Sequence, residues 1–236
     1  MAEIKTRKEI EIMKRAATAG SAAVARALPL IRPGRTEIWV AEQLEAFAKD
    51  SPGYEGLSFP PIIASGPNGA QPHAVPSGRV LREGDFITVD FGVIADGYCS
   101  DMTRTFLLGA ATERQTFVYR TVLAAQTAGV RAAKPGIACK ALDRVCRGVI
   151  EEAGLGEYFI HTTGHGVGTE VHEDPRIGKD SVAVLAPGMV VTIEPGVYIE
   201  GWGGVRIEDT VVITKSGCEV ITAGVSKELL PLYPLR

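Results

Sequence analysis

The chain has 236 residues, of which 45% are hydrophobic and 22% are charged, and its formal net charge is −3. This composition is typical of a soluble globular protein, and the small negative charge disfavours a nucleic-acid or anionic-membrane surface. The sequence contains no run of eighteen apolar residues, so it predicts no membrane-spanning helix. Lysines and arginines near the N-terminus disfavour a secretory signal. Four scattered cysteines without a CxxC pair indicate reduced thiols, so we expect a cytoplasmic location.

The first half of the chain predicts two helices followed by short strands. Apolar residues at three-, four- and seven-residue steps predict a helix over residues 7–28, which ends before Pro33 and Gly34. Thr36 is the predicted N-cap of a second helix that runs to Ala48. Residues 59–110 are rich in Ser, Pro and Gly and contain predicted strands over 86–91 and 102–106.

The second half repeats this pattern. A helix over 113–133 is followed by Pro135 and Gly136, a second helix to about residue 153, and short strands to about residue 220. Residues 81–93 align without gaps on residues 185–197, which places Asp90 level with Glu194. One duplication is too few repeats for a solenoid. We therefore predict one α+β domain over residues 1–236, with pseudo-twofold halves, a central sheet and outer helix pairs.

Four carboxylates lie on the predicted strands. Asp90 and Asp101 flank an Asp-Gly turn, a strong hairpin signal, so we expect them to face each other across the ladder. Glu194 and Glu208 bear a similar relation to a turn at 201–204. If these hairpins were on the surface, the acids would point to water. Hydrophobic flanks instead predict burial, and divalent cations would compensate four carboxylates better than the nearby arginines 104 and 206.

All four histidines lie in stretches rich in Gly and Pro: His73, His161, His165 and His172. A histidine in such a loop is either a hydrogen-bonded structural residue or a functional group. Glycines on both sides of His165 favour a site over a packed helix. Four carboxylates with an imidazole form an oxygen-rich set, which favours Mn²⁺, Co²⁺ or Fe²⁺ over the thiolate sites of structural Zn²⁺.

At these residues the sequence resembles the pita-bread-fold metallopeptidases, and within them the Xaa-Pro peptidases, aminopeptidase P and prolidase. The matching motifs run in family order and cover nearly the whole chain. They are Pro-His-Ala at 72–74, Val-Asp-Phe-Gly at 89–92, the segment 98–105, Thr-Gly-His-Gly-Val-Gly at 163–168, His-Glu-Asp-Pro at 172–175, Thr-Ile-Glu-Pro-Gly at 192–196 and Val-Arg-Ile-Glu-Asp at 205–209.

The resemblance implies two divalent metal ions in each chain, with Mn²⁺ expected first and Co²⁺, Fe²⁺ or Zn²⁺ as alternatives. It implies that Asp90 binds one ion and that Asp101 and Glu208 bridge both. His165 and Glu194 would complete the shell of the second ion.

The resemblance also implies roles toward a peptide substrate. His73 would meet the substrate near the scissile bond, and His172 would donate a hydrogen bond to the carbonyl oxygen as it becomes an oxyanion. Glu194 would act as general base. His161 and Arg206 would line the pocket for proline, and Arg206 would also support a bridging carboxylate.

Several functional alternatives stay open at this point. The Glu-Pro-Gly and Arg-Ile-Glu-Asp motifs favour the Xaa-Pro branch over methionine aminopeptidases, so we expect an Xaa-Pro-type aminopeptidase. We expect the N-terminal domain of Xaa-Pro peptidases to be absent, which leaves a carboxypeptidase, a dipeptidase or a methionine aminopeptidase as alternatives. The complete set of predicted ligands disfavours a non-catalytic binding module and a metal-free creatine hydrolase. The expected partner is a small peptide, with no nucleic acid or membrane, and a homodimer is compatible with the resemblance.

Overall fold

The first half of the chain opens with two capped helices. The computed structural model describes residues 4–229 and 231–232. Helix α1 spans Arg7–Ala27, and Thr6 and Glu9 form a capping box in which each side chain binds the other residue's backbone N–H. Helix α2 spans Glu37–Lys49 and has Thr36 as its N-cap. Both helices begin where the sequence predicts.

The second half repeats this pair of helices. Helix α3 spans Glu113–Ala132 and α4 spans Cys139–Glu152, each ending within one residue of its predicted end. Gly34 and Gly136 occupy equivalent breaks, and their φ angles of +90° and +86° are left-handed conformations that glycine adopts without strain. Within the described residues, short 3-10 helices also lie outside these pairs: η1 (Leu28–Leu30), η2 (Gly66–Ala70) and η3 (Gly156–Tyr158).

The strands of each half follow its helices and pair antiparallel. In the first half they are β1 (Tyr54–Leu57), β2 (Ile62–Ser65), β3 (Phe86–Phe91), β4 (Val93–Ala95), β5 (Tyr98–Cys99) and β6 (Met102–Leu107). In the second half they are β7 (Gly164–Gly166), β8 (Glu173–Ile177), β9 (Val190–Ile193), β10 (Gly196–Ile199), β11 (Gly203–Arg206), β12 (Asp209–Ile213) and β13 (Cys218–Val220). Their sheet orders are β1-β4-β5, β2-β3-β6, β10-β11 and β13-β12-β9-β7-β8.

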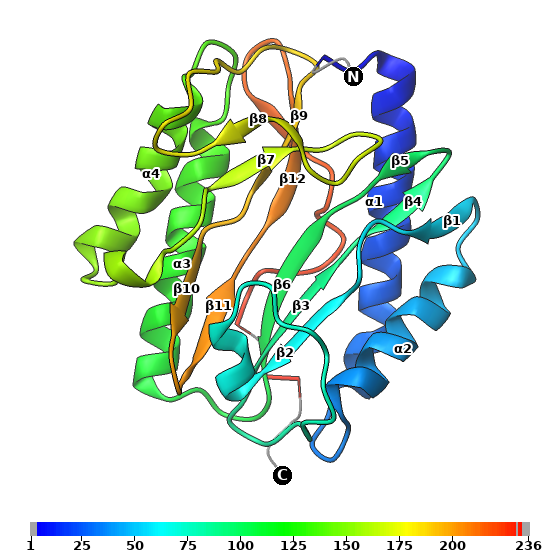
Figure 1. Ribbon diagram of the computed structural model, residues 1–236, viewed down its shortest axis with the longest axis vertical. Helices are drawn as coiled ribbons and strands as arrows, with labels where there is room; N and C mark the ends of the chain where they lie inside the picture. Colours follow the sequence, from blue (N-terminus) through cyan, green and yellow to red (C-terminus); the bar gives the residue numbers. More distant parts are fainter. Residues whose placement is uncertain (1–3, 230, 233–236) are drawn as a thin grey trace.

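The two helix pairs flank the strands. Figure 1 shows α1 and α2 along one side of the molecule, α3 and α4 along the other, and the strands of both halves between them. The halves also share small features. The isolated bridge between Thr36 and Val80 in the first half has its equivalent between Ala138 and Val184 in the second. The predicted α+β class is therefore confirmed.

The alternation of side chains along β3 determines which residues face away from the helices. Ile87, Val89 and Phe91 pack into one hydrophobic core with buried side chains of α1 and α2. Successive residues of a strand point to opposite faces, so Thr88 and Asp90 lie on the other face of β3. The strand thus uses one face for the core and presents Asp90 toward the centre of the molecule.

The register of the first hairpin differs from the prediction. Asp96 and Gly97 form a two-residue turn with positive φ angles, as the Asp-Gly signal predicts. The same register runs on into β3 and β6, where Asp90 pairs with Thr103. The expected direct opposition of Asp90 and Asp101 is therefore wrong, because a two-residue turn places Asp101 two positions away from the partner of Asp90.

The second hairpin keeps its two acids level with each other. Ile193 pairs with Asp209 and Gly196 pairs with Arg206, and both registers place Glu194 opposite Glu208. The turn itself covers residues 200–202, since the ladder closes between residues 199 and 203. The predicted turn at 201–204 is thus shifted, because its two last glycines belong to β11.

Candidate metal centre

The five predicted metal ligands come from both halves of the chain. Asp90 lies in β3, Asp101 follows β5, His165 lies in β7, Glu194 follows β9 and Glu208 lies between β11 and β12. Ligand atoms of Asp101, His165 and Glu208 all lie within 4.8 Å of one another. His165 Nε2 lies 3.1 Å from Glu194 Oε1 and 3.6 Å from Asp101 Oδ2. Four of the five candidates therefore form one group.

Asp90 joins this group through an arginine. Arg206 Nη2 donates to Asp90 Oδ2 at 2.7 Å, and both side chains are nearly buried. The other oxygen, Asp90 Oδ1, is buried and has no hydrogen-bond partner among the described residues. A buried carboxylate oxygen without a partner costs free energy, and a bound cation would satisfy it. The residues present therefore fit a divalent metal ion.

The electrostatics of the group also favour a cation. Burial, and then the charges of neighbouring carboxylates, raise the pKa of Asp101 and of Glu208 well above the ordinary range. Burial opposes charge on Glu194 too, but its hydrogen bond from His165 and the charge of that imidazole lower the Glu194 pKa to about 2. The carboxylates thus repel one another, and a divalent ion would relieve that repulsion in competition with protons.

Threonines orient the ligand side chains. Thr103 Oγ1 donates to Glu208 Oε2 at 2.6 Å, and Thr192 Oγ1 donates to Glu194 Oε1 at 3.0 Å. His165 Nδ1 lies 3.0 Å from the carbonyl of the next residue, which can only accept, so Nδ1 carries a proton and Nε2 faces the carboxylates. Supporting bonds of this kind set the orientation of metal ligands.

A directed chain of hydrogen bonds runs from Arg206 to His161. Arg206 Nη1 donates to the hydroxyl of Tyr198 at 2.8 Å, and this hydroxyl lies 2.8 Å from His161 Nε2. His161 Nδ1 lies 2.7 Å from the Thr162 carbonyl and must donate to it, so the Tyr198 hydroxyl donates to Nε2. Burial raises the Tyr198 pKa to about 12 and lowers the His161 pKa, which keeps both groups neutral.

Sequence reasoning missed Tyr198. The alternation of a strand could have indicated it. Gly196 pairs with Arg206, and Tyr198 lies two residues further along β10, so its side chain points to the same face of the strand. Its role depends on a buried hydroxyl, which no charge pattern reveals.

The two remaining histidines lie exposed beside the buried group. The ring of His172 contacts that of His165, with centroids 4.3 Å apart. Partial burial, and then the charge of His165, lower the pKa of His172. The carbonyl of Pro72, the residue before His73, accepts a hydrogen bond from Arg206 Nη1 at 3.2 Å, which brings His73 close to the same group.

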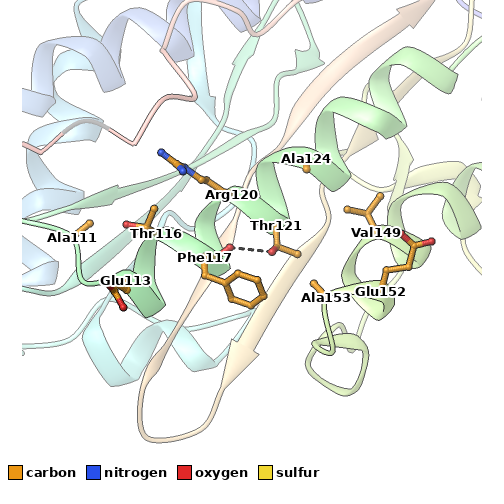
Figure 2. Close-up of a pocket in the computed structure, with 10 residues that line it drawn as sticks. All are labelled: Ala111, Glu113, Thr116, Phe117, Arg120, Thr121, Ala124, Val149, Glu152 and Ala153. Atoms are coloured by element: carbon orange, nitrogen blue, oxygen red, sulfur yellow. Dashed lines mark hydrogen bonds between the residues drawn. The ribbon is translucent and has the colours of Figure 1, made fainter.

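A separate open surface pocket of about 720 Å³ lies between α3 and α4. Phe117, Thr121 and Val149 are among its lining residues, and Figure 2 shows the Thr121 hydroxyl bonded to the carbonyl of Phe117. None of the residues that line it belongs to the predicted metal centre.

Comparison with known proteins shows the family. A model described as metallopeptidase family M24 matches residues 11–215. The chain belongs to metallopeptidase family M24. A curated relative named Xaa-Pro dipeptidase, from Pyrococcus furiosus, is 47% identical over 227 residues, which are 96% of this chain and 65% of the relative. This chain therefore spans about two thirds of that protein's length.

Solved structures of M24 proteins have the same fold. An Xaa-Pro dipeptidase from Bacillus anthracis is 48% identical, with a TM-score of 0.94 over 97% of this chain and 64% of its own. An Escherichia coli aminopeptidase P in complex with substrate is 29% identical, with a TM-score of 0.86 over 95% of this chain and 57% of its own. The pita-bread fold and the resemblance to the Xaa-Pro branch are confirmed.

The M24 chain has a candidate cluster of metal ligands, while the identity and number of the ions stay predictions. No helix within the described part of the chain combines the length and apolar character that a membrane span requires.

Proposed function

We propose that this M24 protein is a two-metal exopeptidase, an Xaa-Pro-type aminopeptidase that hydrolyses small peptides beside proline. The observation that carries the proposal is the buried grouping of Asp101, His165 and Glu208, with an unpartnered oxygen of Asp90 nearby. Relatives named Xaa-Pro dipeptidase support the choice of substrate.

We assign the five ligands as the family resemblance implies. Asp90 would hold one ion, Asp101 and Glu208 would bridge two, and His165 with Glu194 would hold the second. The oxygen-rich donor set favours Mn²⁺, with Co²⁺, Fe²⁺ or Zn²⁺ as alternatives. When bound, the ions would supply Lewis-acid polarisation of the scissile carbonyl.

The chain's own residues would orient the substrate and move protons. His172 donates a hydrogen bond to the carbonyl oxygen as negative charge develops there, and His73 contacts the substrate beside the scissile bond. Glu194 takes a proton as general base. Arg206 lines the proline side, and His161 meets proline with its ring face, because both its nitrogens are bonded within the protein.

Metal analysis combined with a peptide panel tests this function. We expect two divalent ions per chain and hydrolysis of Xaa-Pro and Xaa-Pro-Yaa peptides with Mn²⁺ or Co²⁺, and little hydrolysis of Met-Xaa-Yaa. Matched peptides with acetylated amino ends or amidated carboxyl ends identify which end is recognised. Activity that survives acetylation and disappears on amidation would replace the aminopeptidase assignment with a carboxypeptidase.

Location and assembly also stay proposals. The four scattered cysteines, without a CxxC pair, support a reducing compartment such as the cytoplasm. Sedimentation of the purified protein tests whether it forms the homodimer that the family resemblance allows.

A further inference from the structure

A buried glutamate at the start of α2 has no role in the proposed ligand set. Glu37 is 0% exposed, and its carboxylate accepts hydrogen bonds from Ser65, Asn68 and Ser77; these four residues are called the Glu37 cluster below. Oε1 lies 2.7 Å from the backbone nitrogen and 2.6 Å from the hydroxyl of Ser65. Oε2 lies 3.0 Å and 2.6 Å from the same atoms of Ser77. Donors thus surround both oxygens, as a buried carboxylate requires.

The partners of Glu37 lie on both sides of His73 in the sequence. Ser65 is the last residue of β2, and Ser77 follows His73 by four residues. The backbone of α2 adds a further contact, since the N–H of Ile38 donates to the carbonyl of Ser77 at 3.1 Å. The first turn of α2 therefore binds both ends of the segment 65–77, which carries His73.

The opposite side of this segment contacts the strand that carries Arg206. The carbonyl of Pro72, next to His73, accepts from Arg206 Nη1 at 3.2 Å. Gly69 packs so closely on Gly204 of β11 that a Cβ atom at position 204 would lie 2.1 Å from the Gly69 carbonyl oxygen. The segment is thus held between α2 on one side and β11 on the other, with the His73 side chain exposed.

We propose that Glu37 is a positioning residue, which fixes the segment 65–77 and so holds His73 beside the metal centre. The inference rests on the proposed function, in which His73 contacts the substrate. Glu37 is buried at the start of a helix and acts only through the segment that it binds. Displacement of a positioned group by about 1 Å can lower a rate by ~10²-fold, so loosening this segment affects turnover more than substrate binding.

Kinetics of Glu37→Gln test this role, with Glu42→Gln as the control because Glu42 is exposed on the same helix. In Glu37→Gln an amide NH₂ replaces one acceptor oxygen. This donor then faces the backbone N–H of Ser65 or Ser77, and that hydrogen bond is lost. We expect kcat to fall by about 10-fold to 10²-fold, with KM within about twofold and bound metal unchanged. In a His73→Ala background, Glu37→Gln should cause no further loss. An equal loss in both backgrounds would show a general scaffold effect and overturn the proposal.

Hydrogen exchange of the intact protein gives a second readout that needs no activity. Glu37→Gln, or the milder Ser77→Ala if the first variant does not fold, should speed amide exchange over residues 65–77 while β3 and β6 stay protected. Unchanged exchange over 65–77 overturns the proposal. If the wild-type protein hydrolyses no peptide with any metal, the proposed function fails, and exchange still decides whether Glu37 fixes this segment.

Discussion

The candidate bridging residues are the most sensitive part of the proposed metal centre. Asp101→Ala or Glu208→Ala should remove both ions, because each residue would bind both of them, whereas His165→Ala should weaken mainly one. In Glu208→Ala the Thr103 hydroxyl should lose its acceptor but keep the hydrogen bond that it accepts from Arg206 Nε, so the sheet should not unfold. Elemental analysis of the purified variants measures this, with Glu42→Gln as the control. Retention of both ions in either bridge variant contradicts the ligand assignment.

His172 allows chemistry and metal binding to be separated. Its ring contacts that of His165, yet its side chain is exposed and outside the buried carboxylate group. His172→Ala should lower kcat by about 10²-fold and leave the metal content intact, as expected for a group that stabilises charge in the transition state. Single-turnover kinetics and metal analysis check this. Unchanged turnover would assign His172 a structural role only.

At the scale of elements, two glycines on the packed helices α3 and α4 should respond in opposite ways to alanine. A Cβ at Gly148 of α4 would meet no atom within 4 Å, whereas one at Gly129 of α3 would lie 2.4 Å from the Cys146 sulfur. Gly148→Ala should raise the free energy of unfolding by about 0.5–1 kcal/mol, because alanine loses less backbone entropy in a helix.

Gly129→Ala should instead lower the free energy of unfolding by about 1–3 kcal/mol through overpacking. Denaturant unfolding of both variants beside the wild type measures the two changes, and each variant is the control for the other. Equal effects of the two substitutions would mean that α3 and α4 are not packed as closely as the structure has them.

At the scale of the whole molecule, the stability of metal-free protein should depend on pH. Burial would lower the His165 pKa, but the hydrogen bond and charge of Glu194 outweigh it and raise that pKa from 6.5 to about 9. The stabilisation from this proton is therefore complete below pH 6.5 and is lost as pH rises through 9. The raised pKa values of Asp101 and Glu208 also make the metal-free protein less stable as the pH rises.

The Glu194 carboxylate makes the protein less stable as the pH falls. Its pKa is lowered from 4.5 to about 2, so its stabilisation is present above pH 4.5 and is lost as pH falls through 2. Protein freed of metal by a chelator should therefore melt at a lower temperature at pH 9.5 than at pH 6. The rise in Tm on adding Mn²⁺ should be larger at pH 8 than at pH 5, where protons compete for the ligands. A Tm at pH 8 that does not change when chelator is added would contradict a buried metal site.

The sequence by itself determined the elements and the candidate ligands, because their signals are local. Thr36 marks the start of α2, and the glycines of the Pro-Gly pairs mark the breaks after the first helix of each half. Short runs of residues that favour strands, together with the Asp-Gly pair, located β3, β6 and the first hairpin. Carboxylates within hydrophobic strands, with histidines in glycine-rich loops, indicated a metal centre before any distance was known.

Only the tertiary structure decided how the two halves meet. Arg206 binds Asp90 across 116 residues of sequence, and Thr103 binds Glu208 across 105. The Glu37 cluster likewise depends on a helix, a strand end and a loop meeting in three dimensions. Register placed Thr103, and not Asp101, opposite Asp90. Such contacts have no local signal, because the gain in free energy arises only when distant segments are brought together and buried.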